Sequence, residues 1–245
     1  MDPEFVADEP AVLIGNTLIV SDLHIGIEHD YFLAGIKINS QTNTMRDRLD
    51  NIIKMTKAKN LILLGDIKHK VPGVSYQEIK EIPEFLNHLA KKIKITYVIG
   101  NHDPGVEKLV PKSVDIKPTH GFLKNKIYYN HGHAWPDKSF LGADYLIMGH
   151  MQPQIQFKNN LGATWMEAVW VRTELNKKTI TEKYGKYDKL PEAIIVPSFN
   201  KMAGGHALNV KKEKQRKTPM MSMIKKNTSK IYLLDGTFLG ELKDL

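Results

Sequence analysis

The feature that most restricts the fold of this chain is a short apolar run followed directly by Gly, Asp, Asn or His. This arrangement occurs five times within the first 150 residues, and each run has the composition of a β-strand. We therefore expect each polar cluster to lie just beyond the carboxyl end of a strand. The five runs are Thr17–Val20, Asn60–Leu64, Ile95–Ile99, Ile127–Asn130 and Tyr145–Met148.

Helices are expected between the first three of these strands. Apolar residues recur at helical spacing through residues 42–59, which predicts an amphipathic helix and a βαβ unit. A second helix is expected over residues 79–89, with a start or a bend at Pro83. Alternating strands and helices predict a sheet with helices on its faces, in which groups beyond the carboxyl ends of the strands converge.

The remainder of the chain is richer in strands. Residues 164–175, 193–196, 230–234 and 237–239 are strand-like, and Asp235-Gly236 predicts a hairpin turn. We expect these strands to form a second sheet that packs on the first. The predicted fold is a four-layer α/β/β/α sandwich, with two mixed sheets flanked by helices.

Length and composition favour one soluble domain over residues 6–245. No apolar stretch approaches the roughly 20 residues that cross a bilayer, so we expect no membrane segment. Met1–Phe5 lacks the features of a signal peptide and is interpreted as an expression-vector remnant. The chain has no cysteine, which excludes disulfides, thiolate metal sites and thiol nucleophiles, and fits a cytoplasmic location.

The polar clusters contain oxygen and nitrogen donors without sulfur. Such a set suits manganese, iron, zinc, nickel or cobalt better than copper or an iron–sulfur cluster. A carboxylate can bridge two ions, and two bridged ions can bind a phosphoryl oxygen and activate a shared water. Convergence of these residues therefore predicts a two-metal centre that hydrolyses phosphate esters.

The order of the clusters resembles the signature of the calcineurin-like metallophosphoesterase superfamily. Further strings, among them residues 20–28, 65–69, 131–136 and 198–205, resemble its archaeal branch related to SbcD, some of whose members dimerise, so a homodimer is left open. The matching motifs are Asp22-Leu23-His24, Gly65-Asp66, Gly100-Asn101-His102-Asp103, His131 and Gly149-His150.

This resemblance implies a role for each motif residue. Asp22 and His24 would bind the first ion, and Asp66 would bridge both ions. His102 would be the catalytic histidine near the phosphate, and Asp103 would orient it. The second ion would be bound by Asn101, His131 and His150.

Gln152 departs from the family pattern. It stands at a first-ion position where the family has histidine, and an amide oxygen binds transition metals more weakly than an imidazole does. We therefore expect a first site that is labile, metal-selective or empty.

The expected function is that of a phosphodiesterase or nuclease with two divalent ions, with manganese as the favoured metal, that acts on nucleic acids or nucleotides through a metal-activated hydroxide. One alternative is a small-molecule nucleotidase or phosphomonoesterase. Another is a weakly active or inactive nucleic-acid-binding module, because of Gln152. The sequence identifies no nucleic-acid-binding residue, and the net charge of +8 fits either a polyanionic substrate or a lysine-rich surface.

Several other residues are open to two interpretations. Glu28 and His69 could touch substrate or support the ligands through hydrogen bonds, and His133 is left outside the metal shell. Trp165 and Trp170 are expected in the core. The lysine-rich segment Lys211–Lys230 is interpreted as a mobile basic loop, either solvated and disordered, which is the favoured interpretation, or able to guide a phosphate backbone.

Overall fold

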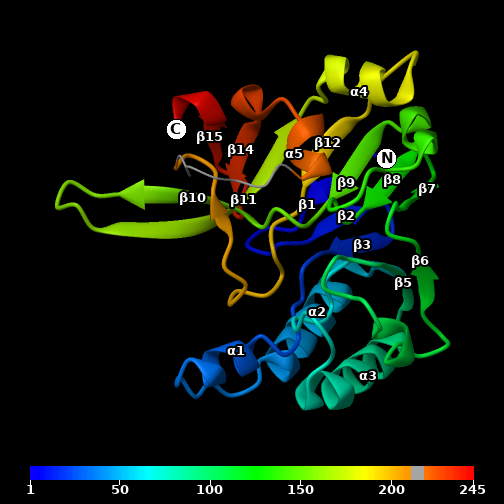
Figure 1. Cartoon of the computed structure of the whole chain (residues 1–245), viewed down its shortest axis with the longest axis vertical. Helices are drawn as coiled ribbons and strands as arrows, with labels where there is room; N and C mark the ends of the chain where they lie inside the picture. The colour runs from blue at the N-terminus through cyan, green and yellow to red at the C-terminus, as the bar shows by residue number, and fades with distance from the viewer. Residues whose placement is uncertain (211–217) are drawn as a thin grey trace.

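Two mixed β-sheets packed face to face form the centre of the computed structural model, which describes residues 1–210 and 218–245 (Figure 1). In the first sheet, β3 to β6 are parallel and β1 and β2 are antiparallel additions at one edge. Its strands, in spatial order, are β1 (Glu4–Phe5), β2 (Val12–Ile14), β3 (Thr17–Val20), β4 (Asn60–Leu64), β5 (Lys94–Val98) and β6 (Asp115–Lys117).

The second sheet has a parallel centre, in which β9 lies between β8 and β12, and antiparallel flanks. Both β14 and β12 pair with β11, and β15 pairs with β14. Its strands are β7 (Phe122–Lys124), β8 (Ile127–Asn130), β9 (Tyr145–Met148), β10 (Pro153–Lys158), β11 (Thr164–Thr173), β12 (Glu192–Ile195), β13 (His206–Ala207), β14 (Lys230–Leu233) and β15 (Phe238–Glu241).

Helices cover the outer faces of both sheets. Figure 1 shows α2 and α3 on one side of the sheets and α4 and α5 on the other. The helices are α1 (Glu28–Leu33), α2 (Thr42–Thr56), α3 (Tyr76–Ala90), α4 (Lys177–Tyr184) and α5 (Pro219–Met223), with 3-10 turns η1 (Val106–Lys108), η2 (Lys138–Gly142), η3 (Lys226–Thr228) and η4 (Leu242–Asp244). The predicted α/β/β/α sandwich is confirmed.

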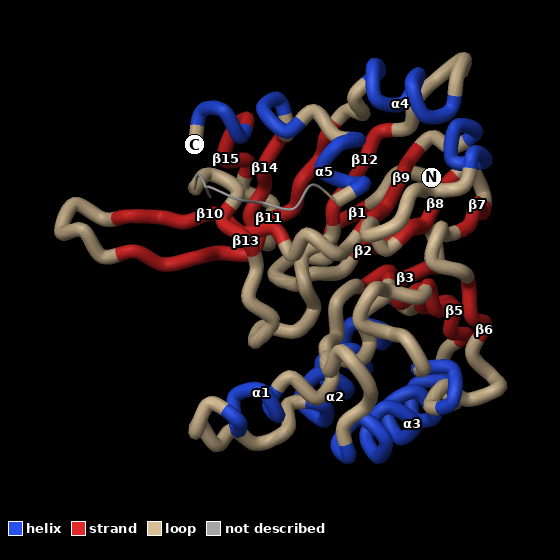
Figure 2. The backbone as a smooth tube through the Cα atoms, in the orientation of Figure 1, coloured by secondary structure: helices blue, strands red, loops and turns tan. Residues whose placement is uncertain are grey.

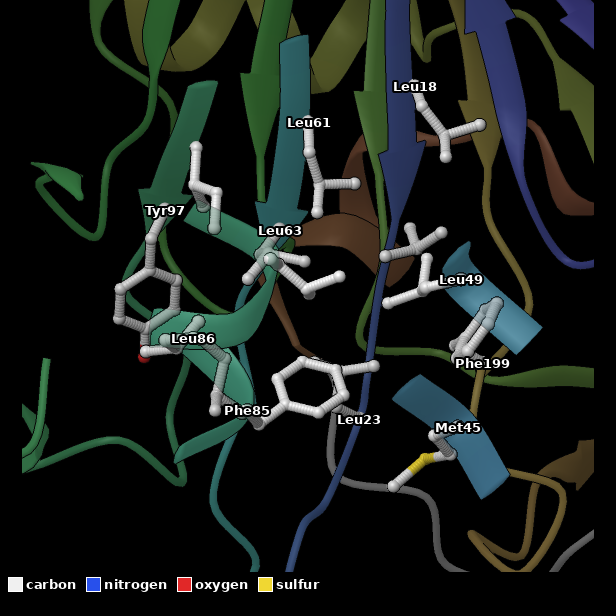
Figure 3. Close-up of a cluster of buried hydrophobic side chains, with 14 of the residues drawn as sticks. Leu18, Leu23, Met45, Leu49, Leu61, Leu63, Phe85, Leu86, Tyr97 and Phe199 are labelled. Carbon is white, nitrogen blue, oxygen red and sulfur yellow. The ribbon is translucent and has the colours of Figure 1, made fainter. Parts of the chain in front are cut away.

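Three apolar clusters hold these layers together. Leu49 of α2 and Phe85 of α3 pack on Leu18 and Leu61 of the first sheet (Figure 3). Between the sheets, residues such as Ile62 meet residues of the second sheet, and a third cluster joins the second sheet to α4 and α5. Burial of the central strands on both faces explains why they appear in the sequence as continuous apolar runs.

The second helix begins earlier than its apolar pattern predicted. Helix α3 starts at Tyr76, and Pro83 lies inside it. The start is set by a capping box, in which the Ser75 side chain accepts from the Glu78 amide and the Glu78 carboxylate accepts from the Ser75 amide. This polar signal precedes Ile82, the first buried apolar residue of the helix, and was missed.

One tryptophan expected in the core is largely exposed. Trp170 is fully buried, whereas Trp165 is 47% exposed. The first half of β11 pairs only with β10, and this hairpin projects from the body of the molecule (Figure 2). Trp165 stacks there on Phe157, at 5.5 Å between ring centroids, in place of a core contact.

The lysine-rich segment is only in part a loop. Residues 211–217 lie outside the described residues. The rest of the segment contains α5 and η3, and Met220 and Met223 are buried against the second sheet. The prediction of a mobile basic loop over the whole of Lys211–Lys230 is therefore wrong, because these apolar residues tie its second half to the core.

At the amino end, Glu4 and Phe5 pair with β2, and Phe5 stacks on Trp170 at 4.4 Å. The interpretation of residues 1–5 as a vector remnant and the domain limits 6–245 stay predictions. Within the described residues, no helix combines the length and apolar character needed to cross a bilayer.

Candidate metal centre

The loops that follow β3, β4, β5, β8 and β9 meet at one edge of the two sheets. They bring together carboxylate, amide and imidazole groups from segments that are far apart in the sequence. Three groups of potential ligands have all their donor atoms within 4.8 Å of one another. One consists of His24, His69 and His102, and the other two share Asp66. These two are Asp22, His24 and Asp66, and Asp66, His131 and His150.

Asp66 belongs to two of the three groups. Its Oδ2 lies 3.8 Å from Nε2 of His24 and 3.2 Å from Nε2 of His131. Nε2 of His24 is also 3.7 Å from Oδ1 of Asp22, and Nε2 of His131 is 3.2 Å from Oδ1 of Asn101. Two donors that share one ion at 2.0–2.2 Å can be no more than about 4.4 Å apart, so these separations fit ions shared by the paired groups.

The imidazoles of His131 and His102 are held by backbone carbonyls. Nδ1 of His131 lies 2.6 Å from the carbonyl oxygen of Leu64, and Nδ1 of His102 lies 2.5 Å from that of His69. A carbonyl only accepts, so each Nδ1 carries the proton and donates it. Nε2 of each ring is thereby left to bind an ion or exchange a proton.

Backbone strain is concentrated in this centre. Asp22, His24, Asp66, His150 and Gln152 all have positive φ angles, between 42° and 69°. Side chains disfavour this region, and strain of this kind persists where the surrounding structure imposes it. Five of the nine non-glycine residues with positive φ in the described chain are thus candidate ligands.

Glycines allow the ligand loops to approach one another. At Gly149 a Cβ atom would overlap the Ser21 hydroxyl, and at Gly65, where φ is +75°, it would overlap the His131 ring. The Ser21 hydroxyl itself donates to the Asp22 carboxylate and lies 2.9 Å from the carbonyl of Leu64. Gly149 is therefore required by close contact, and Gly65 by close contact and by its backbone conformation.

Asp66 and His131 form a buried pair of opposite charge. Burial alone would raise the pKa of the Asp66 carboxyl, but the charge and hydrogen bond of His131 hold that pKa well below its usual range. Burial likewise opposes the charge of His131, yet Asp66 raises the pKa of its imidazole to about 9. In the metal-free protein near neutral pH this pair is ionic, so an ion that binds His131 must displace a proton.

His150 and His133 behave in the opposite way. Burial and the positive charge of His131 lower the pKa of each imidazole to about 4, which leaves both neutral. The ring of His133 lies 5.3 Å from that of His131, and its buried Nδ1 has no hydrogen-bond partner among the described residues. His133 therefore lies beside the ligand groups, while His150 belongs to one of them.

The sequence suggested that Asp103 orients His102, but within the described residues the Asp103 carboxylate makes no hydrogen bond to that imidazole. Its carboxylate accepts from the backbone amides of Asp66 at 2.7 Å, Gly100 at 2.6 Å and Lys68 at 3.3 Å. The imidazole of His102 is instead held by the carbonyl of His69. Asp103 is fully buried and ties the loop after β4 to the loop after β5, so it positions the backbone of Asp66.

Gln152 lies where the motif placed it. Its Nε2 is 3.1 Å from Oδ1 of Asp22 and 2.7 Å from Nε2 of His24. Which amide atom faces the site is an assignment, because a rotation of the group exchanges nitrogen and oxygen. The amide can thus either bridge these residues as a donor or turn its oxygen toward an ion.

Two sets of supporting residues were missed from the sequence or left undecided. Asn200 is buried and donates to the carbonyl of Leu23 at 2.8 Å, and the Ser198 hydroxyl donates to that of Asp22 at 2.9 Å. These bonds fix the Asp22–His24 loop. In the sequence, the resemblance of residues 198–205 to the SbcD-related branch was the signal that could have pointed to Ser198 and Asn200. Glu28 accepts from the Gln41 amide at 2.6 Å and so supports a loop away from the ligands.

Comparison with known proteins agrees with this geometry. Residues 15–176 match the family model described as calcineurin-like phosphoesterase. No curated protein matches the chain in sequence. Among solved structures, the chain is similar to the nuclease MPE of Pseudomonas putida, with 17% identity, a TM-score of 0.57 and coverage of 95% of this chain and 96% of that chain.

A second structure is the phosphoesterase Yfce of E. coli, with 16% identity, a TM-score of 0.44 and coverage of 92% of this chain and 97% of that chain. At these identities the likeness to the nuclease MPE concerns the fold alone.

Proposed function

This chain belongs to the calcineurin-like phosphoesterase family, and from that premise we propose that it hydrolyses phosphodiester bonds in nucleic acids or nucleotides with two divalent metal ions. The observation that carries the proposal is the Asp66 carboxylate, which takes part in two of the ligand groups. A shared carboxylate between two groups of oxygen and nitrogen donors is the arrangement expected of a two-metal hydrolase.

We assign the ligands to two sites that share Asp66. The first site consists of Asp22, His24, Asp66 and Gln152, and the second of Asp66, Asn101, His131 and His150. Ions held by these residues would supply Lewis-acid stabilisation of a phosphoryl oxygen and a more acidic bound water. Manganese is our choice, since it tolerates the oxygen-rich first site better than softer metals do.

His102 is the proposed proton donor to the leaving oxygen. Its Nδ1–H is bonded to the His69 carbonyl, so Nε2 is the atom at which a proton would be carried and released. The backbone amide of His102 also donates to Oδ1 of Asp66 at 2.8 Å, which couples its position to that of the shared carboxylate. Asp103 acts as a positioning residue through its bonds to the Asp66 and Gly100 amides.

A polyanionic substrate is supported by the net charge of +8. We also assign the chain to the SbcD-related branch, on its 20–28, 65–69 and 131–136 strings. A second candidate, a nucleic-acid-binding module with little turnover, is favoured by one observation: the side chain beside Asp22 and His24 is the amide of Gln152, which binds transition metals more weakly than an imidazole does.

The test is hydrolysis of a chromogenic phosphodiester and the matched phosphomonoester, with and without added manganese. The variants are Asp66→Asn and His102→Ala, and His88→Ala is the control because His88 pairs with Asp50 away from the centre. We expect manganese-dependent turnover of the diester that falls by roughly 100-fold or more in both variants and is unchanged in the control.

Each other outcome has a definite meaning. Preference for the monoester would favour a nucleotidase or phosphomonoesterase. Absence of turnover with any divalent metal, in folded protein that still binds DNA or RNA, would favour the binding module.

A further inference from the structure

His24 differs from the other anchored histidines of the centre in what holds its Nδ1. The Nδ1 atoms of His131 and His102 face carbonyl oxygens, which fix the tautomer of each ring. Nδ1 of His24 faces another imidazole, with Nδ1 of His69 at 3.2 Å. An imidazole nitrogen can donate or accept, so this contact alone leaves the tautomer of His24 undetermined.

Asp30 removes this ambiguity. Its Oδ2 lies 2.9 Å from Nε2 of His69, on the opposite side of the ring from His24. A carboxylate accepts, so Nε2 of His69 carries the proton and its Nδ1 holds a lone pair. That lone pair accepts from Nδ1–H of His24, which leaves Nε2 of His24 unprotonated and facing Asp22 and Asp66.

The same residues also suggest a competing role. His24, His69 and His102 have donor atoms within 4.8 Å of one another and could hold an ion of their own. If such an ion took Nδ1 of His24 while Nε2 served the first site, the ring would have to lose both protons. A neutral imidazole offers one lone pair only, so the hydrogen-bonded chain is the chemically simpler state.

We propose that Asp30 and His69 are positioning residues that fix the orientation and the tautomer of His24, so that its Nε2 is free to bind an ion at the first site. The inference rests on the proposed function, since it needs an ion at that site. It also bears on Gln152, because a His24 imidazole held in one orientation and one tautomer would offset in part the weaker binding by an amide. The buried His24 comes from the loop after β3, His69 from the loop after β4 and the more exposed Asp30 from α1.

The first experiment measures how many manganese ions bind and with what affinity each site binds its ion. Activity is not a readout of this experiment. In His69→Leu we expect the weaker site to lose about 10- to 100-fold in affinity, the range typical of groups that orient a ligand. Asp30→Ala should lose less, because its carboxylate is 61% exposed. His69→Asn places an acceptor near the former Nδ1 and should recover most of the affinity.

Matched controls exist within the chain. His88 and Asp50 make a similar contact, Nε2 to Oδ2 at 2.7 Å, between α3 and α2. His88→Leu and Asp50→Ala should bind manganese as the wild type does. In the His69 variants the backbone carbonyl that holds His102 is retained, so loss of affinity would not stem from a displaced His102.

The second experiment reads the tautomers directly. Long-range 1H–15N correlation spectra of zinc-loaded protein should show His69 protonated at Nε2 and His24 protonated at Nδ1. A His69 ring protonated at Nδ1, or metal-bound at that atom, would overturn the proposal.

These measurements separate the two levels of inference. Unchanged affinity in His69→Leu and Asp30→Ala, together with loss of one ion in His24→Ala, would overturn the positioning role and leave the proposed function intact. A wild-type chain that binds a single ion, or a His24→Ala chain that still binds two, would overturn the first site and the positioning role with it.

Discussion

The backbone of Gln152 has a positive φ of 46°, as do the proposed ligands Asp22 and His24 beside it. Its backbone therefore resembles that of a ligand, and only its side chain differs from the histidine of the family pattern. Replacing it with histidine should therefore place an imidazole nitrogen in the first site without rebuilding the loop. We expect Gln152→His to raise the affinity of the weaker manganese site by about 10-fold or more. Calorimetric titration with manganese would measure the change.

Gln154→His is the matched control, because Gln154 lies two residues further along, in β10, and makes no contact with Asp22 or His24 among the described residues. If Gln152→His binds manganese no more tightly than the wild type does, Gln152 is not a first-site ligand. Gained affinity without faster diester hydrolysis would separate metal occupancy from turnover.

The titration of three histidines should give the metal-free protein a stability maximum near pH 6.5. Asp66 raises the pKa of His131 from 6.5 to about 9. The contribution of His131 to the free energy of unfolding is therefore complete below pH 6.5 and is lost as the pH rises toward 9. Burial lowers the pKa of His133 and of His150 from 6.5 to about 4. The unfolded chain then binds more protons than the folded one between pH 6.5 and 4, and stability falls as the pH falls.

Urea unfolding of chelator-treated protein between pH 4.5 and 9 would test this. Between pH 6.5 and 9 the free energy of unfolding should fall by on the order of 3 kcal/mol, since the pKa of His131 rises from 6.5 to about 9 on folding. His131→Asn should remove the alkaline slope and make the acidic one shallower, because burial still lowers the pKa of His133 and His150 but the charge of His131 no longer does. An unchanged alkaline slope in that variant would assign the loss to another group.

At the scale of elements, the loop after β3 depends on a brace from the loop after β12. The Asn200 side chain bonds the carbonyl of Leu23 and accepts from the Met202 amide at 2.9 Å, and it is only 2% exposed. Asn200→Ala leaves these buried groups without partners, which should cost about 1–3 kcal/mol of the free energy of unfolding. Because this loop carries Asp22 and His24, the first site should weaken while the second keeps its affinity.

Asn209→Ala is the comparison, since Asn209 also bonds backbone on both sides, with the amide and carbonyl of Gln156 at 3.0 Å each. It should lower stability without changing either metal site. Equal loss of affinity at both sites in Asn200→Ala would mean that the brace supports the whole centre.

The elements that the sequence predicted correctly are those in which several signals coincide. Strands β3, β4, β8 and β9 are buried runs bounded by ligand motifs, and their limits agree with the prediction. The hairpin of β14 and β15 is also confirmed, with Gly236 at φ of 92° in the turn. The short strands β1, β2, β6 and β7 went unassigned, because two or three residues carry too little pattern to separate them from loops.

Within the site, motif residues were predictable and their partners were not. Asp66 and Asn101 stand in strings whose order points to them, so the sequence alone indicated that these ligands converge. The bond of Asp30 to His69 and the distribution of Asp103 bonds depend on how α1 and two loops pack, and no local spacing encodes that. Trp165 was misplaced for a similar reason, because its strand leaves the core halfway along its length.

At the scale of the whole molecule, the excess of positive charge should act on long substrates only. A nucleic acid releases counterions as lysines and arginines neutralise its phosphates, so its affinity falls steeply with salt. A chromogenic diester carries one charge and should respond weakly. We expect the KM for single-stranded DNA or RNA to rise by roughly 10-fold or more between about 50 and 200 mM salt, with the KM for the small diester nearly constant.

Substitutions in residues 211–217 can test whether this part of the chain causes the salt dependence. Their sequence contains Lys211, Lys212, Lys214, Arg216 and Lys217, whereas the following residues up to Lys230 include the buried Met220 and Met223. Deleting the whole basic segment would therefore damage the core. Replacing the five basic residues with glutamine removes the charge and leaves α5 in place.

If this cluster binds a nucleic-acid backbone, the glutamine variant should have a salt dependence shallower by roughly 0.7 for each phosphate of a single strand that it no longer neutralises. Its turnover of the small diester should equal that of the wild type, because no ligand of the centre has changed. A matched variant with five lysines of α2, α3 and α4 replaced controls for net charge: Lys54, Lys80, Lys177, Lys178 and Lys183. An equally shallow salt dependence in both variants would mean that the overall field of the protein, and not residues 211–217, attracts the polyanion.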